Sequence, residues 1–189
     1  MSATPGWQLR APDLETPRLT LRPLEARDVV PLQGWQSDPA STRYLPYEPR
    51  SRDQVAAFVD RFGGARERWH DGDRVVFAVV RDEDAAVIGE VHLASRRHAV
   101  REVELGWVFS PEVAGGGYAT EASRAVRDLA LGAGAHRVVA EVDPRNTASA
   151  RLCARLGMRQ EPFFRADLPS SEGWLDTAIW ALVEGDPLP

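Results

Sequence analysis

The sequence predicts a single α/β domain built on a mixed β-sheet, and three observations support this fold class. The 189 residues fit one domain of ordinary size. Segments that alternate every two residues, as strands do, are interleaved with segments of helical periodicity. A glycine cluster joins one such strand to a long amphipathic helix. We therefore assign residues 1–14 to a flexible arm, because they hold prolines and no periodicity, and residues 15–189 to the domain.

The first elements are a short strand and two helices. Leu19 and Leu21 point to one side of an alternating segment, which predicts a strand over residues 18–23. Apolar side chains at helical spacing predict helices over residues 25–37 and 52–69, and Ser51 is a good N-cap for the second. The Pro-rich segment between them, residues 39–49, reads as a loop.

Three strands come next. Residues 75–80 are nearly all apolar, as in a strand at the centre of a sheet. A turn at residues 82–84 leads into a strand over 86–95. Residues 103–109 alternate, so that Val103, Leu105, Trp107 and Phe109 share one face and Glu104 and Gly106 lie on the other.

The C-terminal third alternates helix and strand before a closing strand pair. Apolar spacing predicts a helix over residues 118–133, followed by a strand over 137–142. Asn146 is a suitable N-cap for a helix over residues 147–156, which Gly157 ends. The final strands are expected at residues 158–166 and 174–183, with a loop at 167–173.

Composition limits the classes of partner. The net charge of −5 argues against a nucleic-acid or anionic-membrane partner and is compatible with a cationic substrate. The single cysteine excludes an internal disulfide and fits a reducing compartment. Because the sequence also shows neither a signal-peptide core nor an apolar run of membrane-spanning length, we expect a cytoplasmic protein. The four histidines have no metal-ligand spacing, so no metal site is expected.

The glycine cluster is a candidate phosphate site. Residues 114–122 read AGGGYATEA between a strand and a helix. The first backbone N–H groups of a helix are unpaired and lie at the positive end of the helix dipole, and glycines let a ligand approach them. Together they would form a pyrophosphate cradle. No Lys-Ser or Lys-Thr follows, which excludes a Walker loop. A turn that binds nothing remains the alternative.

Three side chains are candidates for acid–base chemistry. Glu104 lies one step before Gly106, where a bulge or a close approach would free backbone groups for a ligand and for an oxyanion. Its carboxylate would accept a proton from an amine. Ser149 and Cys153 lie one helical turn apart, and either would serve as a proton donor. The alternatives are a solvated sheet face for Glu104, local capping for Ser149 and a small buried apolar side chain for Cys153.

In order and spacing, these motifs resemble the GNAT acetyltransferase superfamily and, within it, the ribosomal-protein N-terminal acetyltransferase (RimJ/RimL-like) group. The marks are Arg-Leu-Thr-Leu-Arg at 18–22, Glu-Leu-Gly-Trp at 104–107, Gly-Tyr-Ala-Thr-Glu-Ala at 117–122, Asn146 with Ser149, and Leu-Gly-Met at 156–158. Trp174 and Asp176 in the closing strand complete the set. The resemblance covers roughly residues 15–184. It implies a sheet of about seven strands flanked by about four helices and splayed between the fourth and fifth strands.

The resemblance also implies acetyl-CoA as co-substrate and a set of residues that bind it. The backbone of the glycine loop would hold the pyrophosphate, and the preceding strand and one asparagine would hold the pantetheine arm. These residues are Gly115, Gly116, Gly117, Tyr118 and Ala119 for the pyrophosphate, and Trp107, Val108, Phe109 and Asn146 for pantetheine. Two departures stand out. Ala114 replaces a usual Gln or Arg, and Cys153 replaces a Tyr that serves many superfamily members as general acid.

For catalysis the resemblance implies Glu104 as base and Ser149 as acid, with Cys153 as the alternative acid. The acceptor would be a primary amine of a protein N-terminus, an aminoglycoside or a polyamine. Plausible acceptor-binding residues are Tyr44, Tyr47, Glu48, Glu90 and Trp174. Competing hypotheses are a non-catalytic CoA-binding or sensing module and a protein that binds nucleotide phosphate. Homodimers are common in such folds, so a homodimer is possible.

Overall fold

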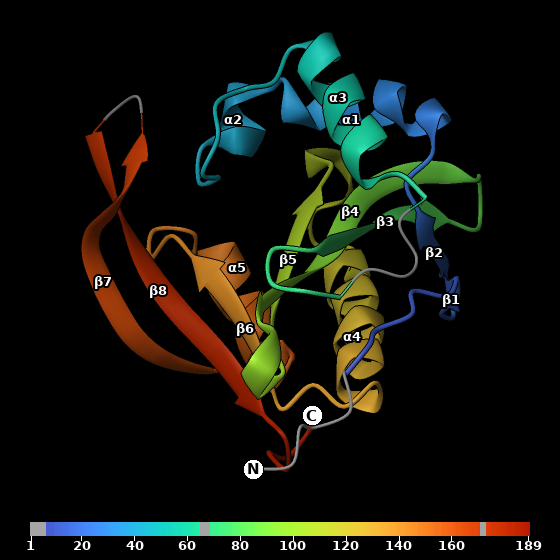
Figure 1. Ribbon diagram of the computed structural model, residues 1–189. Helices are drawn as coiled ribbons and strands as arrows, with labels where there is room; N and C mark the ends of the chain where they lie inside the picture. Colours follow the sequence, from blue (N-terminus) through green and yellow to red (C-terminus); the bar gives the residue numbers. More distant parts are fainter. Residues whose placement is uncertain (1–6, 65–68, 171–172) are drawn as a thin grey trace.

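The computed structural model describes residues 7–64, 69–170 and 173–189 and shows one open, eight-stranded sheet (Figure 1). The strand order is β1-β2-β3-β4-β5-β6-β8-β7. All neighbours are antiparallel except β5 and β6, which are parallel. The strands are β1 (Leu14–Glu15), β2 (Leu19–Pro23), β3 (Arg74–Arg81), β4 (Ala86–Arg97), β5 (Glu102–Phe109), β6 (Arg137–Val142), β7 (Arg159–Ser170) and β8 (Gly173–Val183). The mixed α/β fold predicted from sequence is confirmed, with the two-residue β1 added.

Helices cover both faces of this sheet, and each face has its own apolar cluster. Because side chains alternate along a strand, β3 sends Val75, Phe77 and Val79 into one cluster and Val76 and Ala78 into the other. The first cluster packs against α4 and α5, and the second against α1 and α3. The α-helices are α1 (Val29–Gln36), α2 (Pro39–Thr42), α3 (Arg52–Phe62), α4 (Tyr118–Gly132) and α5 (Thr147–Arg155).

The helix boundaries differ from the sequence prediction in three places. A 3-10 turn, η1 (Ala26–Asp28), precedes α1, and the expected loop at 39–49 begins with α2, for which Asp38 supplies the N-cap. Helix α3 begins after Ser51 as predicted but ends at Phe62, because Gly63 and Gly64 leave the helical conformation. Among the described residues, no helix is both long and apolar enough to cross a membrane.

The described part of the N-terminal segment packs against the domain. Leu9 and Ala11 are buried in the core, and the ring of Trp7 lies edge-on to that of Trp69 with 5.1 Å between centroids. The indole nitrogen of Trp7 also donates a hydrogen bond to the carbonyl of Ala133. Residues 7–14 of the expected arm thus contact the domain, and residues 1–6 lie outside the described residues. The apolar side chains of this N-terminal segment are buried although the segment has no helix or strand periodicity, because it packs against the sheet.

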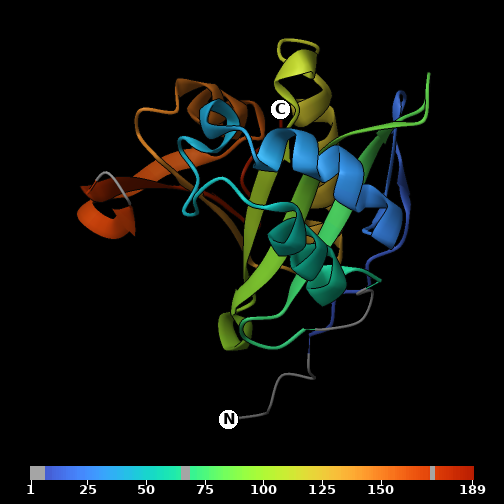
Figure 2. The same cartoon turned by 90° about the horizontal axis from the view of Figure 1, so that it is seen from above.

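Strands β7 and β8 form a hairpin that extends beyond the rest of the sheet (Figures 1 and 2). The loop expected at 167–173 is mostly strand, since Leu168 pairs with Leu175. One of the register shifts in β7, between Gln160 and Phe163, contains Pro162, which cannot donate to the ladder. Residues 171–172 lie outside the described part of the chain.

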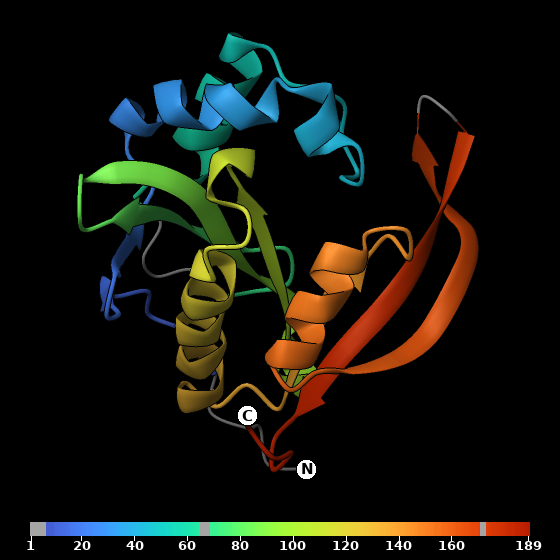
Figure 3. The same ribbon diagram turned by 180° about the vertical axis from the view of Figure 1, so that it is seen from behind.

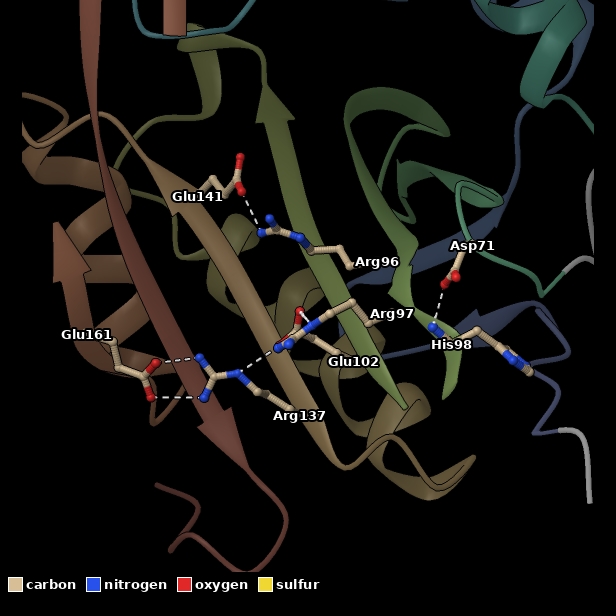
Figure 4. Close-up of polar contacts among 8 residues, drawn as sticks. All are labelled: Asp71, Arg96, Arg97, His98, Glu102, Arg137, Glu141 and Glu161. Carbon is tan, nitrogen blue, oxygen red and sulfur yellow. Dashed lines mark hydrogen bonds and ion pairs between the residues drawn. The ribbon is translucent and has the colours of Figure 1, made fainter. Parts of the chain in front are cut away.

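Ion pairs tie neighbouring strands together on one sheet face (Figure 4). The Glu102 carboxylate on β5 accepts from Arg97 of β4 and, at 3.0 Å, from Arg137 of β6. Arg137 in turn pairs with Glu161 of β7. Glu102 is almost fully buried, so its two arginines compensate its charge and hold the pKa of this carboxyl below its usual value.

Candidate active site

The functional site lies where β5 and β6 separate. Their parallel pairing runs through Glu102↔Arg137, Val103↔Val138 and Glu104↔Val139 and then stops, although both strands continue. From Leu105 onward, β5 pairs only with β4, so its edge toward β6 has no strand partner. Behind this opening α4 and α5 lie side by side (Figure 3). The predicted splay between the fourth and fifth expected strands is confirmed at this point.

Two hollows open on opposite sides of the splay. One, here called the large groove, has a volume of about 1080 Å³ and runs between β5, the glycine loop and the facing sides of α4 and α5. The other, here called the small cavity, holds about 190 Å³ between the loop before α3, the middle of the sheet and the β7–β8 hairpin. Five residues line both hollows and mark their junction, namely Leu45, Trp107, Val108, Asn146 and Ser149.

The glycine loop presents free backbone donors to the large groove. Gly115 and Gly117 have φ values of +81° and +80°, a region that other residues rarely adopt. Gly117 caps α4, and the first intrahelical bond runs from the Glu121 amide to the Gly117 carbonyl. The amides of residues 118–120 therefore have no partner within the helix. Of the predicted pyrophosphate residues, Gly115, Gly117, Tyr118 and Ala119 line the groove, whereas Gly116 does not.

A clamp between Arg18 and Glu121 holds this loop. Arg18 donates to Glu121 Oε2 at 2.8 Å through Nε and to the Gly116 carbonyl at 3.0 Å through Nη1. Its guanidinium also lies 4.3 Å from the centre of the Tyr118 ring. Thr16 adds a third donor to the Glu121 carboxylate at 2.7 Å. A cationic side chain thus reaches the loop from the segment just before β2, although position 114 is alanine.

The remaining predicted CoA residues lie at the junction. Trp107, Val108 and Phe109 line the large groove along the unpaired edge of β5. Asn146 caps α5 by accepting from the Ser149 amide at 3.0 Å, as its side chain predicted. An extended amide ligand pairs with such a strand edge in the way that an added strand does.

Glu104 lines the small cavity with its side chain 23% exposed. The ring of His92 lies beside it, with 3.8 Å between Nε2 and Oε1, too long for a hydrogen bond. Burial raises the pKa of Glu104, but His92, Arg74 and Arg96 outweigh it, so the net shift is downward. The carboxylate is therefore ionised at neutral pH and free to accept a proton.

The His92 ring also explains Gly106. The two residues are paired across β4 and β5, and a Cβ at position 106 would lie 2.2 Å from His92 Cε1. The ladder is regular at this point, so of the two predicted alternatives, a bulge or a close approach, the structure shows the approach. Burial lowers the pKa of His92, and its Nε2 has no hydrogen-bond partner among the described residues.

Ser149 and Cys153 occupy different environments. Ser149 lies at the junction, where its Oγ accepts a hydrogen bond of 3.3 Å from the indole nitrogen of Trp107. Cys153 is fully buried in the core and lines neither hollow. Burial raises the pKa of its thiol to about 12. Helix α5 is oriented so that Ser149 faces the opening between β5 and β6, whereas Cys153 faces the core.

Of the predicted acceptor-binding residues, some line the small cavity and others do not. Tyr44, Tyr47 and Glu90 line the small cavity. Glu48 and Trp174 do not, because Glu48 faces solvent and Trp174 is 68% exposed near the end of the hairpin. Glu90 is almost fully buried and accepts two hydrogen bonds of 3.1 Å from Gln36. Burial raises the pKa of this carboxyl to about 7, although Arg50, Arg74 and Gln36 each lower it.

Several side chains of the small cavity carried no signal in the sequence. They include Arg50, Arg74, His92 and Glu141. Glu141 follows the last β5–β6 pair and is held at 2.5 Å by Arg96 of β4 (Figure 4). Period-two alternation places Glu141 on the same face as Val139, but only the sheet order reveals that this face borders the splay.

This fold, with its sheet open between β5 and β6, is that of an acyltransferase. The model of the acetyltransferase (GNAT) domain matches residues 18–159, and the chain belongs to this family of acetyl-CoA-dependent enzymes.

Named relatives extend over nearly the whole chain. An uncharacterized N-acetyltransferase, YnaD, of Bacillus subtilis is 30% identical and covers 90% of this chain and 96% of its own. The [ribosomal protein uS5]-alanine N-acetyltransferase of Escherichia coli is 26% identical, with 93% of each chain covered. A GNAT-family acetyltransferase from Bacillus anthracis superposes with a TM-score of 0.82 at 26% identity, covering 91% of this chain and 98% of its own. The resemblance to a RimJ-like GNAT group is confirmed.

Proposed function

We propose that this enzyme transfers the acetyl group of acetyl-CoA to a primary amine by direct attack in a ternary complex. The observation that carries the proposal is that the large groove and the small cavity meet at one junction, where β5 leaves β6. A donor in one hollow and an acceptor in the other would bring their reacting atoms together there without a covalent enzyme intermediate.

The large groove suits the donor. The unpaired amides at the start of α4 and the positive end of its dipole match the pyrophosphate. The free edge of β5 from Leu105 to Phe109 matches the two amides of pantetheine. The thioester then lies beside Val108, and we assign a main-chain N–H near Val108 to the oxyanion.

Proton transfers follow from the groups at the junction. Glu104 takes a proton from the ammonium, directly or through water, and the neutral amine forms a bond to the thioester carbonyl carbon. When the tetrahedral intermediate collapses, the carbon–sulfur bond breaks and the thiolate takes a proton from Ser149. Ser149 regains a proton from the attacking nitrogen, which becomes the nitrogen of the amide product. Because Cys153 is enclosed in the core, we assign it no part in the transfer.

Thiol release with an amine panel tests the mechanism, and Glu104→Gln is the decisive variant. General-base catalysis contributes typically 10²–10⁴-fold, so we expect kcat to fall by about 100-fold or more. Since the pKa of Glu104 is below its usual value, the wild-type rate should not decline between pH 8 and 6 through this group. Glu83→Gln, an exposed change in the β3–β4 turn, serves as control. An unchanged rate in Glu104→Gln would remove this residue from the mechanism.

Binding and turnover separate the enzyme from a CoA sensor. A ligand at 100 times its Kd stabilises the folded state by about 2.7 kcal/mol, so acetyl-CoA should raise Tm clearly and ATP should not. Acetyl-CoA binding without thiol release for any amine would overturn the proposal in favour of the non-catalytic module.

A further inference from the structure

The acidic side chains of the small cavity, apart from Glu104, are already engaged within the protein. Each accepts a hydrogen bond or an ion pair from a neighbouring group, and an arginine compensates the charge of Glu141 and of Asp143. The pairs are Glu141 with Arg96 at 2.5 Å, Asp143 with Arg145 at 2.6 Å, Asp176 with the Ala166 amide at 2.8 Å, and Glu90 with Gln36 at 3.1 Å. A polycationic acceptor would need free carboxylates, and these are not free.

Arg50, unlike these acidic side chains, lines the small cavity without an ion pair among the described residues. Its guanidinium lies 3.8 Å from the centre of the Tyr47 ring and 4.7 Å from that of Phe58. One nitrogen, Nη1, donates to Gln36 Oε1 at 2.9 Å, and Arg50 has no ion pair among the described residues. Aromatic faces and one hydrogen bond thus fix the guanidinium before any ligand arrives, which lowers the entropy lost on binding.

Arg74 is still less engaged. Its side chain has neither an ion pair nor a hydrogen bond within the described ranges, and its nearest ring, Phe62, lies 5.7 Å away. Its charge nevertheless acts on Glu90, His92 and Glu104, so the guanidinium reaches the interior of the cavity. Two arginines therefore face one buried carboxyl, Glu90, and leave this wall with an excess of positive charge.

A neutral donor completes this wall. The Tyr47 hydroxyl is buried without a hydrogen-bond partner among the described residues. Burial raises the pKa of Tyr47, so the hydroxyl keeps its proton and can donate it in a hydrogen bond. A buried donor without a partner costs free energy unless a ligand satisfies it.

We infer that the acceptor is a small amino acid, whose carboxylate binds Arg50, Arg74 and Tyr47 while its amine faces Glu104. The inference rests on the proposed function and narrows its substrate class. The guanidinium fork matches a carboxylate in geometry as well as in charge. At about 190 Å³ the cavity is smaller than the 300–1,000 Å³ of a typical ligand pocket, which favours a small acceptor over a long one.

Matched acceptors test the carboxylate directly. We would measure kcat/KM for the proteinogenic amino acids and for their carboxamides, corrected for the fraction of free amine, with spermidine as polycationic comparison. Charge-assisted hydrogen bonds contribute about 1.5–3 kcal/mol, so the preferred amino acid should exceed its amide by roughly 10- to 100-fold. Amides or spermidine that react as well as the amino acids would overturn the inference and leave the proposed function intact.

Arginine variants assign the preference to residues. Arg50→Gln and Arg74→Gln should each lower kcat/KM for the amino acid about tenfold or more and leave that for its amide within about twofold. Arg52→Gln removes the same charge from an exposed position on α3 and should keep the full preference. Equal losses for amino acid and amide would show a merely structural role and contradict the assignment.

A binding measurement separates the two proposals. Calorimetry of the CoA-loaded protein with the same amino acids and amides requires no turnover. Carboxylate-dependent binding without thiol release would support the inference and defeat the proposed catalysis. Thiol release without any carboxylate dependence, in turnover or in binding, would defeat the inference alone.

Discussion

At the scale of single residues, the small cavity contains closely packed and buried groups whose substitution should change stability. The Gly106 backbone lies against the His92 ring, and Nε2 of that ring lies 3.8 Å from the carboxylate of the catalytic candidate Glu104. The same cavity holds Glu90, a carboxyl that burial drives toward neutrality. The contact between Gly106 and His92 predicts an effect of packing on stability, and the burial of Glu90 predicts that stability depends on pH.

Gly106→Ala should destabilise the fold by about 1–3 kcal/mol, the usual cost of overpacking, because the new Cβ would overlap the His92 ring. Urea unfolding of this variant, of His92→Ala and of the double variant measures the coupling between the two positions. The cost of the added methyl should largely disappear in the His92→Ala background. A cost that is independent of His92 would show that the backbone, and not this ring, requires glycine.

Glu90→Gln should stabilise the protein increasingly as pH rises. The pKa of Glu90 is about 7 in the folded state against an ordinary 4.5, so between these values the folded state binds more protons than the unfolded state. Wild-type stability therefore falls across this window, by up to about 3 kcal/mol. Unfolding free energies at pH 5, 6, 7 and 8 should diverge between variant and wild type, and parallel curves would contradict the assignment.

At the scale of elements, the donor site is made by the ends of helices and strands. The groove exists because β5 and β6 stop pairing after Glu104, and its phosphate-binding end is the start of α4. The loop that begins α4 is fastened to the segment before β2 by Arg18 and Glu121. These contacts order the loop without using the side chain at position 114.

Arg18→Ala should weaken acetyl-CoA binding measurably while destabilising the fold only slightly. The Arg18–Glu121 pair is partly exposed, so its contribution to stability is about 1 kcal/mol at most. If the less ordered loop costs acetyl-CoA binding about the same free energy, Kd should rise roughly fivefold, which calorimetry can measure. Arg27→Ala, which breaks an exposed pair with Glu25, is the control. Wild-type affinity in Arg18→Ala would show that the loop is ordered without the clamp.

At the scale of the whole molecule, distant segments of the chain complete one core. Trp7, Leu9 and Ala11 from the N-terminal segment join the cluster formed by the sheet and α4. The same cluster includes Leu182 from the final strand. Stability is thus shared between segments that lie more than 100 residues apart in the sequence.

Leu9→Ala should cost about 2–5 kcal/mol, because it removes buried methyl groups from a closed core. Val30→Ala, at a side chain that is 67% exposed on α1, should change stability by no more than about 0.5 kcal/mol. Thermal or urea unfolding checks both. A cost for Leu9→Ala as small as that for Val30→Ala would mean that the N-terminal segment docks without stabilising the domain.

The sequence by itself determined the features that depend on neighbouring residues. Alternation predicted the faces of β5, side-chain chemistry predicted the caps Ser51 and Asn146, and the glycine run predicted the loop before α4. Each is a local property, because helix and strand periods are set within a few residues. The family motifs were read from the same short segments, and the matching family model confirms the family that they indicated.

Only the tertiary structure decided which side chains meet. The order of strands and the end of the β5–β6 ladder bring Arg50, Arg74, His92 and Glu104 into one cavity. The rotation of α5 turns Ser149 toward the opening, and Cys153 into the core. No periodicity encodes these choices, since they depend on contacts between segments far apart in the chain and on how tightly the core packs around them.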